Sequence, residues 1–513
     1  MPRVSKDYIL SIDQGTTGTT VVVYQIKDQQ LMPIGKKTTD FPQHFPKAGW
    51  VEHDLNEIWG SLKSSVEGAE AQAKEVNAGF SLNQVAAIGI TNQRETLCVF
   101  DRHTSEPLFP AIVWQCKRSL EICDELKANG LEDAYRGKTG LFLDPYFSGT
   151  KLAWMLRENQ QLRRDLSSGK VAIGTIDTYL MHRLSSADGY CTEASNASRT
   201  LLFDIKKGEW DVDLARELGL DSVSVLPEVK SSYGEFTKTK NVGFLPDGIP
   251  ISGCLGDQQA ALAGQRCFAP GLAKCTYGTG AFLLRNIGNE FALSEHGLLT
   301  TVAWSAGGEL IYALEGAAFI AGAAVQFIRD QFGFLTDAKD SEAMSQSVHA
   351  APEIYFVPSL AGLGVPYWEP DARGAILGLT RGASKNQIVR ATLEGVAFQV
   401  MDLLEAMSAT TGSNTKALRV DGGAAANSLL MQSQANFCQT NIERPHNLET
   451  TALGAGLFAA LGAGVFSGLE DLQQSMNIER TFLPESGEHL MEQVKGWRAA
   501  IKAVQAFAQR GDS

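Results

Sequence analysis

A strand-turn-strand pattern that occurs twice, half a chain apart, constrains the fold more than any other feature of the sequence. Apolar, β-branched runs at 8–12 and 21–26 flank a turn rich in glycine and threonine, and runs at 272–276 and 282–286 flank Tyr277-Gly278-Thr279-Gly280. Two apolar runs joined by such a turn predict a β-hairpin. Because the same design opens both halves of the chain, we expect two related α/β domains.

The length of the chain also favours two domains. A chain of 513 residues exceeds what one hydrophobic core usually serves, about 250–300 residues. We place the boundary near Gly264, which gives domains 1–264 and 265–513. Apolar periodicity predicts helices at 55–76, 119–127 and around 452–465, and strands at 85–90, 97–100 and 417–420. We expect a surface loop at 238–253, and an apolar stripe along 490–507 that docks on the core.

The net charge of the chain limits its partners. A formal charge of −13 repels nucleic-acid phosphates and anionic membranes, so we expect neither as a partner. A small anion remains compatible where a metal ion or backbone N–H groups neutralise it locally. No apolar stretch approaches the roughly 20 residues that span a bilayer, and the start lacks the apolar segment of a signal peptide, so we expect a cytoplasmic protein. The eight cysteines form no C-x-x-C pair, which predicts reduced thiols.

Three glycine-rich turns follow strands in this chain. They lie at 13–17, 277–280 and 421–423. Glycine lets a backbone approach a phosphate closely, and threonine hydroxyl and backbone N–H groups donate to phosphate oxygens. One such turn alone is more often an ordinary hairpin tip, but three matched turns favour a nucleotide site. The sequence has neither a P-loop nor the protein-kinase motifs, so another nucleotide-binding fold is required.

Several longer motifs resemble those of the FGGY carbohydrate kinases, and some are specific to the glycerol branch of that family. The matching blocks are DQGTT at 13–17, GITNQRET at 89–96, AIVWQC at 111–116, DPYFSGTK at 144–151, SNASRT at 195–200, GDQQAA at 256–261, KCTYGTG at 274–280, PYW at 366–368, RGA at 373–375, DGG at 421–423 and ETTALGA at 449–455. The resemblance implies an α/β fold of two actin-like (ribonuclease-H-like) domains. ATP and a polyol would meet in the interdomain cleft. We also expect a homo-oligomer, either a dimer or a tetramer.

The residues for a polyol fit this resemblance. Arg94 offers a fork of donors and Glu95 an acceptor, which suits hydroxyl groups that both donate and accept. The alternative for this pair is a solvated ion pair without consequence. Aromatic side chains would cover the carbon edge of the polyol. By resemblance, the residues that bind glycerol are Arg94, Glu95, Trp114, Tyr146, Asp257, Gln258 and Phe282.

Two aspartates are candidates for the chemistry of phosphoryl transfer. Asp257 can accept the proton of the attacking hydroxyl, and its alternative role is that of a helix N-cap. Asp13, with Asp257, would hold Mg²⁺ through oxygen ligands and water. By resemblance, Thr16, Thr17, Gly18 and Thr279 contact the phosphates of ATP. The nucleoside end would be lined by Gly322, Gln326, Gly423 and Asn427.

Two positions depart from the family pattern. Thr20 stands where these kinases usually carry an arginine, and Gly248 stands where relatives inhibited by fructose bisphosphate carry one. We therefore expect weaker phosphate binding and no such inhibition. Two other functions stay open. The chain could be a kinase of a pentulose or tetritol, or a catalytically idle binding protein that senses glycerol or ATP.

Overall fold

Two β-sheets built on the same plan form the centre of the computed structural model, which describes residues 6–348, 353–447, 449–474 and 476–509. The first sheet has the strand order β13-β14-β5-β1-β2-β3. The second has the order β17-β18-β16-β15-β21-β22-β23. The bounds of the first set are β1 Tyr8–Gln14, β2 Gly18–Lys27, β3 Gln30–Asp40, β5 Val85–Asn92, β13 Tyr233–Lys238 and β14 Pro250–Gly256. Those of the second are β15 Leu272–Tyr277, β16 Ala281–Gly288, β17 Leu299–Ala306, β18 Glu309–Ala318, β21 Ala417–Asp421, β22 Ile442–Pro445 and β23 Ile478–Phe482.

The pairing of strands repeats between the sheets. In each, the first strand pairs antiparallel with the second and the second with a third, as in β1-β2-β3 and β15-β16-β18. The first strand also pairs in parallel with a strand that follows later, β5 or β21. The repeat in the sequence is therefore a repeat of structure, which confirms the predicted pair of actin-like α/β units.

Helices cover both sheets. They are α1 Leu55–Val76, α2 Leu120–Ala128, α3 Glu132–Thr139, α4 Ser148–Glu158, α5 Gln160–Ser167, α6 Ile176–Leu184, α7 Ala194–Ala197, α8 Val212–Glu217, α9 Asp257–Gly264, α10 Gly322–Asp330, α11 Asp340–Gln346, α12 Lys385–Thr411, α13 Ser428–Cys438, α14 Thr450–Gly462, α15 Leu469–Gln474 and α16 Glu488–Ala508. Short strands lie between them at β4 Glu52–His53, β6 Cys98–Asp101, β7 Ala111–Ile112, β8 Val171–Gly174, β9 Cys191–Glu193, β10 Phe203–Asp204, β11 Glu209–Trp210, β12 Glu228–Lys230, β19 Tyr355–Val357 and β20 Ala375–Leu377. None of the described helices is long and apolar enough to cross a membrane.

Strand β1 shows how the first sheet is packed on both faces. Tyr8, Leu10 and Ile12 belong to a core with α1 and α6. The alternate residue Ile9 belongs to another core, formed with α9 and α14. Successive side chains on a strand point to opposite faces, so Asp13 shares the face of Ile9. Asp13 therefore lies on the side where α9 and α14 separate the two sheets.

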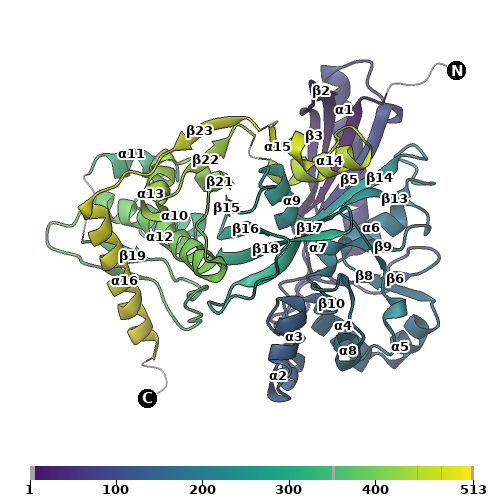
Figure 1. Cartoon of the computed structure of the whole chain (residues 1–513), viewed down its shortest axis with the longest axis horizontal. Coiled ribbons are helices and arrows are strands. Elements are labelled where there is room, and N and C mark those ends of the chain that lie inside the picture. The colour runs from purple at the N-terminus through teal and green to yellow at the C-terminus, as the bar shows by residue number, and fades with distance from the viewer. Residues whose placement is uncertain (1–5, 349–352, 448, 475, 510–513) are drawn as a thin grey trace.

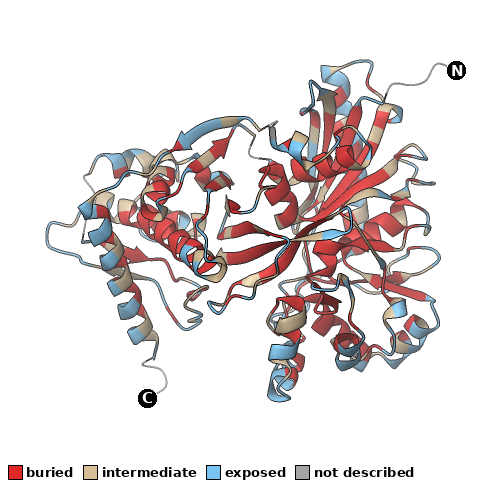
Figure 2. Cartoon of the chain, in the orientation of Figure 1, coloured by how far each residue is buried: buried red, intermediate tan, exposed pale blue. Residues whose placement is uncertain are grey.

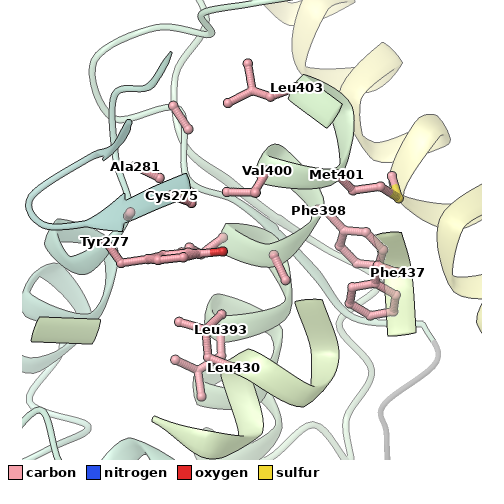
Figure 3. Close-up of a cluster of buried hydrophobic side chains, with 14 of the residues drawn as sticks. Cys275, Tyr277, Ala281, Leu393, Phe398, Val400, Met401, Leu403, Leu430 and Phe437 are labelled. Carbon is pink, nitrogen blue, oxygen red and sulfur yellow. The ribbon is translucent and has the colours of Figure 1, made fainter. Parts of the chain in front are cut away.

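The core of the second sheet is shown in Figure 3. Tyr277 lies against the long helix α12, and its hydroxyl donates to Gln434 Oε1 on α13 at 2.7 Å. Phe398 stacks on Phe437, with ring centroids 4.0 Å apart. Burial is continuous through this region and through the first sheet (Figure 2). The strand that precedes the second glycine-rich turn is thus held on a rigid base.

Helix α14 comes from late in the sequence but packs on the first sheet, as Figure 1 shows. Glycines allow this close contact. A Cβ atom on Gly89 would come within 2.2 Å of the Ala455 carbonyl oxygen, and one on Gly454 within 1.9 Å of the Ala260 carbonyl oxygen. The first sheet is therefore closed on this face by a helix that the chain reaches only after building the second sheet.

Most elements predicted from periodicity are present. The helix at 55–76 is α1, the one at 119–127 is α2 within one residue, and the buried helix around 452–465 is α14. The prediction of a loop at 238–253 is partly wrong, because β14 begins at Pro250 and forms an inner strand. The stripe on α16 docks through buried Trp497 and Ile501, but Phe507 is 62% exposed. All eight cysteines are free. The expectation about the start of the chain falls partly on residues 1–5, outside the described residues.

Candidate active site

The first glycine-rich turn and the start of α9 bring Asp13 and Asp257 together. Asp13 is the last residue but one of β1 and pairs with Thr91 of β5, while β14, on the other side of β5, leads directly into Asp257. Burial, then Asp257 and then Glu449 raise the pKa of Asp13 to about 7. Burial also raises the pKa of Asp257, against the opposing effect of Arg94. Two partly buried carboxylates that repel each other form a place where a divalent cation would be favoured.

The donor set at this place consists of oxygen. Within the part of the chain that the structure describes, no three histidine, cysteine, aspartate or glutamate side chains gather as a metal site. Two carboxylates are nevertheless sufficient for Mg²⁺, which keeps several waters and uses one or two carboxylates together with substrate phosphates. Asp13 and Asp257 therefore fit this ion, and they do not form a closed cage for another one.

Asp257 begins helix α9 instead of capping it. The N-cap residue is Gly256, and the Asp257 side chain accepts a hydrogen bond from the backbone N–H of Gln258 at 2.7 Å. The alternative prediction that Asp257 is the N-cap of this helix is therefore wrong, because the N-cap lies one residue earlier. The side chain is 31% exposed, so part of it is accessible.

Arg94 and Glu95 are buried, at 3% and 1% exposure, so they are not a solvated surface pair. The two groups lie 3.7 Å apart, between Arg94 Nε and Glu95 Oε1, and Arg94 Nε also lies 3.3 Å from Asp257 Oδ1. Glu95 has a φ of 61°, in the left-handed region that non-glycine residues seldom occupy. Gly256 makes room for the arginine, because a Cβ there would come within 2.8 Å of Arg94 Cδ.

Aromatic rings border this polar cluster. Trp114 and Tyr146 meet edge to face with centroids 5.3 Å apart. The indole N–H of Trp114 donates to the Thr16 hydroxyl at 3.0 Å. The predicted polyol wall thus contacts the predicted phosphate turn. Phe282 lies on β16, opposite Thr276 of β15, and belongs to the second half of the chain.

The remaining residues of the first turn are held by the backbone. The N–H of Gly15 donates to the Gly18 carbonyl at 2.9 Å, and the N–H of Phe41 donates to the Thr17 carbonyl at 3.2 Å. A Cβ on Gly18 would come within 2.8 Å of Asp40 Oδ1, so a larger residue there would have to displace the Asp40 side chain. Thr20 bonds to the Thr38 hydroxyl at 2.8 Å at the exposed surface.

The predicted nucleoside residues gather around the second turn. The N–H of Gly322, the first residue of α10, donates to the Gly278 carbonyl at 3.0 Å, and the N–H groups of Ala321 and Ala323 donate to the Thr279 carbonyl. Gln326 lies on the same helix. Gly423 and Asn427 follow β21, where Asn427 caps α13 by accepting from the N–H of Leu430 at 3.0 Å. The structure thus brings all four of these residues to one end of the second sheet.

Three charged residues of this region were not identified as site residues from the sequence. Glu315 on β18 accepts both terminal nitrogens of Arg94, at 2.7 and 2.8 Å. Arg199 donates through Nε to Glu95 Oε1 at 2.6 Å and through Nη2 to Glu315 Oε1 at 3.2 Å. Buried Lys274 on β15 donates to the Gln258 side chain. Charged residues alone within apolar strands, such as Lys274 and Glu315, are the signal that could have pointed to them.

Comparison with known proteins agrees with this geometry. The model of the FGGY family of carbohydrate kinases, N-terminal domain, matches residues 8–264, and that of the C-terminal domain matches residues 273–463. Glycerol kinase of Bacillus licheniformis is 46% identical over 501 residues, covering 98% of this chain and 99% of that protein. Glycerol kinase of Carboxydothermus hydrogenoformans is 47% identical, with 97% and 98% covered.

Solved structures resemble the fold closely. The crystal structure of Plasmodium falciparum glycerol kinase with ADP has a TM-score of 0.91 at 33% identity and covers 98% of both chains. A xylulose kinase from Lactobacillus acidophilus has a TM-score of 0.85 at 20% identity, again with 98% of both chains covered, and supports the fold alone. Both domains, the near full-length identity and the shared fold lead to one conclusion. The chain belongs to the FGGY family of carbohydrate kinases.

Proposed function

We propose that this chain phosphorylates glycerol to sn-glycerol 3-phosphate with ATP. The observation that carries the proposal is the contact between Trp114 and Thr16, because it joins the polar cluster at Arg94, Glu95 and Asp257 to the phosphate turn. A hydroxyl group bound in that cluster would lie beside the end of a triphosphate. The relatives named glycerol kinase, similar over nearly the whole chain, support glycerol as the polyol.

Asp257 acts as the general base in the proposed reaction. As the hydroxyl oxygen forms its bond to the γ-phosphorus, the bond from that phosphorus to the bridging β,γ-oxygen breaks and ADP leaves. The proton of the hydroxyl passes to the Asp257 carboxylate. Burial raises the pKa of this group, so it binds a proton more readily than an exposed aspartate. Lys274, held next to Gln258, keeps the second half of the chain close to this base.

The other predicted residues hold the two substrates. Arg94, Glu95, Trp114, Tyr146, Gln258 and Phe282 enclose the polyol. Asp13 and Asp257 would hold Mg²⁺, which when bound neutralises charge on the triphosphate. Backbone and hydroxyl groups of Thr16, Thr17, Gly18 and Thr279 donate to phosphates. Gly322, Gln326, Gly423 and Asn427 line the nucleoside end of the site.

A single assay tests this function. ADP release is measured with glycerol, dihydroxyacetone, erythritol, ribitol or xylulose, and without any acceptor. We expect the highest kcat/KM with glycerol, and product that sn-glycerol-3-phosphate dehydrogenase oxidises. A pentulose that exceeds glycerol by about tenfold would assign a different substrate. No acceptor-dependent release, together with measurable glycerol binding, would identify a sensor instead.

Two properties of the whole protein remain predictions. We expect the chain to act in the cytoplasm and to form a dimer or a tetramer. Light scattering coupled to size-exclusion chromatography measures the second property, and cell fractionation the first.

A further inference from the structure

We propose that Glu315 is a positioning residue of the polyol site, which fixes Arg94 and Arg199 and thereby ties acceptor binding to the second half of the chain. The inference rests on the proposed kinase function but does not require that the acceptor be glycerol. It concerns a carboxylate that comes from β18, whereas both arginines come from the first half of the chain.

The geometry of the Arg94 contact is that of a matched fork. Arg94 Nη1 lies 2.7 Å from Glu315 Oε2 and Nη2 lies 2.8 Å from Oε1. Two parallel charge-assisted hydrogen bonds fix the plane of the guanidinium as well as its position. Both side chains are withdrawn from solvent, with 2% exposure for that of Arg94 and 7% for that of Glu315. Water therefore competes little for these bonds.

Arg199 makes the cluster a closed network. Its Nη2 reaches Glu315 at 3.2 Å and its Nε reaches Glu95 at 2.6 Å, so each guanidinium faces both carboxylates. The two positive and two negative charges balance. Burial alone would raise the pKa of Glu315, but Arg199 and then Arg94 lower it to about 2. The two arginines thus favour the charged form of Glu315.

The hydrogen bonds of this network determine which N–H groups of Arg94 remain for a substrate. Glu315 takes one N–H of each terminal nitrogen, and Gln259 Oε1 accepts the other N–H of Nη1 at 3.3 Å. The Nε atom faces Asp257. This leaves chiefly one Nη2 proton for an acceptor hydroxyl. Arg94 can therefore donate a directed hydrogen bond to a single hydroxyl group, and Glu315 fixes the direction of that bond.

The register of the second sheet shows why β18 can deliver this charge. Glu315 pairs with Leu284 of β16, which pairs with Lys274 of β15, so these side chains share one face of the sheet. Phe282 and Thr276 form the next row on that face. One rigid surface therefore carries Glu315, the aromatic wall residue Phe282 and the lysine that holds Gln258.

The test compares Glu315→Gln, which keeps the shape but loses the charge, with Glu315→Asp, which keeps the charge on a shorter side chain. Glu309→Gln, on an exposed residue of the same strand, is the control. For each variant, KM and kcat are measured separately for the acceptor and for ATP. Removing one partner of a buried ion pair is costly, so we expect kcat/KM for the acceptor to fall roughly 10²–10³-fold in Glu315→Gln.

Two further results are expected. KM for ATP stays within about threefold of the parent, and kcat/KM for the acceptor is roughly tenfold higher in Glu315→Asp than in Glu315→Gln. Equal losses for acceptor and ATP, or equal losses in both variants, would show a purely structural role and overturn the inference. If Glu315→Gln does not fold, the split between acceptor and ATP in Glu315→Asp decides.

Failure of the proposed function gives a different pattern. A parent that prefers another polyol fails the glycerol assignment, and the same comparison is then made with the preferred polyol. A parent without any acceptor-dependent turnover fails the kinase proposal itself. In that case glycerol binding by calorimetry replaces kinetics, and unchanged affinity in Glu315→Gln would overturn the inference.

Discussion

The two glycine-rich hairpins share one strand pairing but differ in what surrounds them. The first, after β1, ends beside carboxylates and exposes threonine hydroxyls, and Asp13 there has a pKa raised to about 7 by burial and by Asp257 and Glu449. The second, after β15, is bonded through its backbone to α10 and packs against Gly422. The repeated scaffold thus has one end with two neighbouring carboxylates, where the cation and the reacting phosphate are predicted, and one end held by backbone hydrogen bonds, where the nucleoside is predicted.

The largest expected effect concerns the acidic end. Asp257→Asn keeps the shape of the side chain but cannot take up a proton, so kcat should fall roughly 10²–10⁴-fold while the glycerol Kd changes little. Because phosphoryl transfer has a loose transition state, the loss can lie at the lower end of this range. Kinetics and calorimetry on the same preparation measure both quantities. A kcat within about threefold of the parent, with weakened glycerol binding, would make Asp257 a binding residue.

The end of the second hairpin is tested through Gly422. Its φ of 85° disfavours any side chain, and a Cβ would come within 2.4 Å of the Tyr277 carbonyl oxygen. We expect Gly422→Ala to displace the second turn at a cost of about 2–3 kcal/mol, seen as a raised KM for ATP with glycerol affinity unchanged. Gly412→Ala is the matched control, since Gly412 has a φ of 65° but no atom within 4 Å of its added Cβ. An equal rise in KM for ATP in Gly422→Ala and Gly412→Ala would contradict a specific role of the second hairpin in nucleotide binding.

The pH dependence of stability separates the two ends further. The pKa of Asp13 is raised in the folded protein from 3.8 to about 7, so the folded state retains a proton that the unfolded state loses. Its contribution to stability is present below about pH 4 and is lost as pH rises through 7. Asp13→Asn should therefore raise the free energy of unfolding by about 1–2 kcal/mol at pH 8 but not at pH 4. Thermal unfolding without Mg²⁺ measures this, and a gain at both pH values would contradict it.

The smallest effect is expected at Thr20. An arginine there would project from β2 on the face of Asp13, since the two residues are paired across β1 and β2. We expect Thr20→Arg to tighten ATP binding by roughly 0.5–1 kcal/mol, the scale of a partly exposed charge contact. Thr38→Arg, at the position that bonds to Thr20 on the next strand, tests whether any nearby cation suffices. An unchanged KM for ATP in Thr20→Arg would mean that this position does not reach the phosphates.

Local patterns in the sequence predicted much of the fold. The alternation in β1 and the periodicity of α1 act over a few residues, and both elements form where they were expected. Most of the candidate site residues lie in the blocks that match the FGGY pattern, such as 13–17, 256–261 and 274–280. Glu315 could not be assigned in this way, because its partners Arg94 and Arg199 lie far away in the sequence and meet it only after both sheets have formed.

The place of α14 has a consequence for synthesis on the ribosome. The face of the first sheet that carries Gly89 and Gly253 is covered by helix α14, residues 450–462. This face can therefore be covered only after residues 450–462 have left the exit tunnel. Until then the nascent chain exposes an apolar, glycine-lined surface that can bind other chains. The order of translation therefore makes the first half of the molecule the last to be completed, although it is the first to be made.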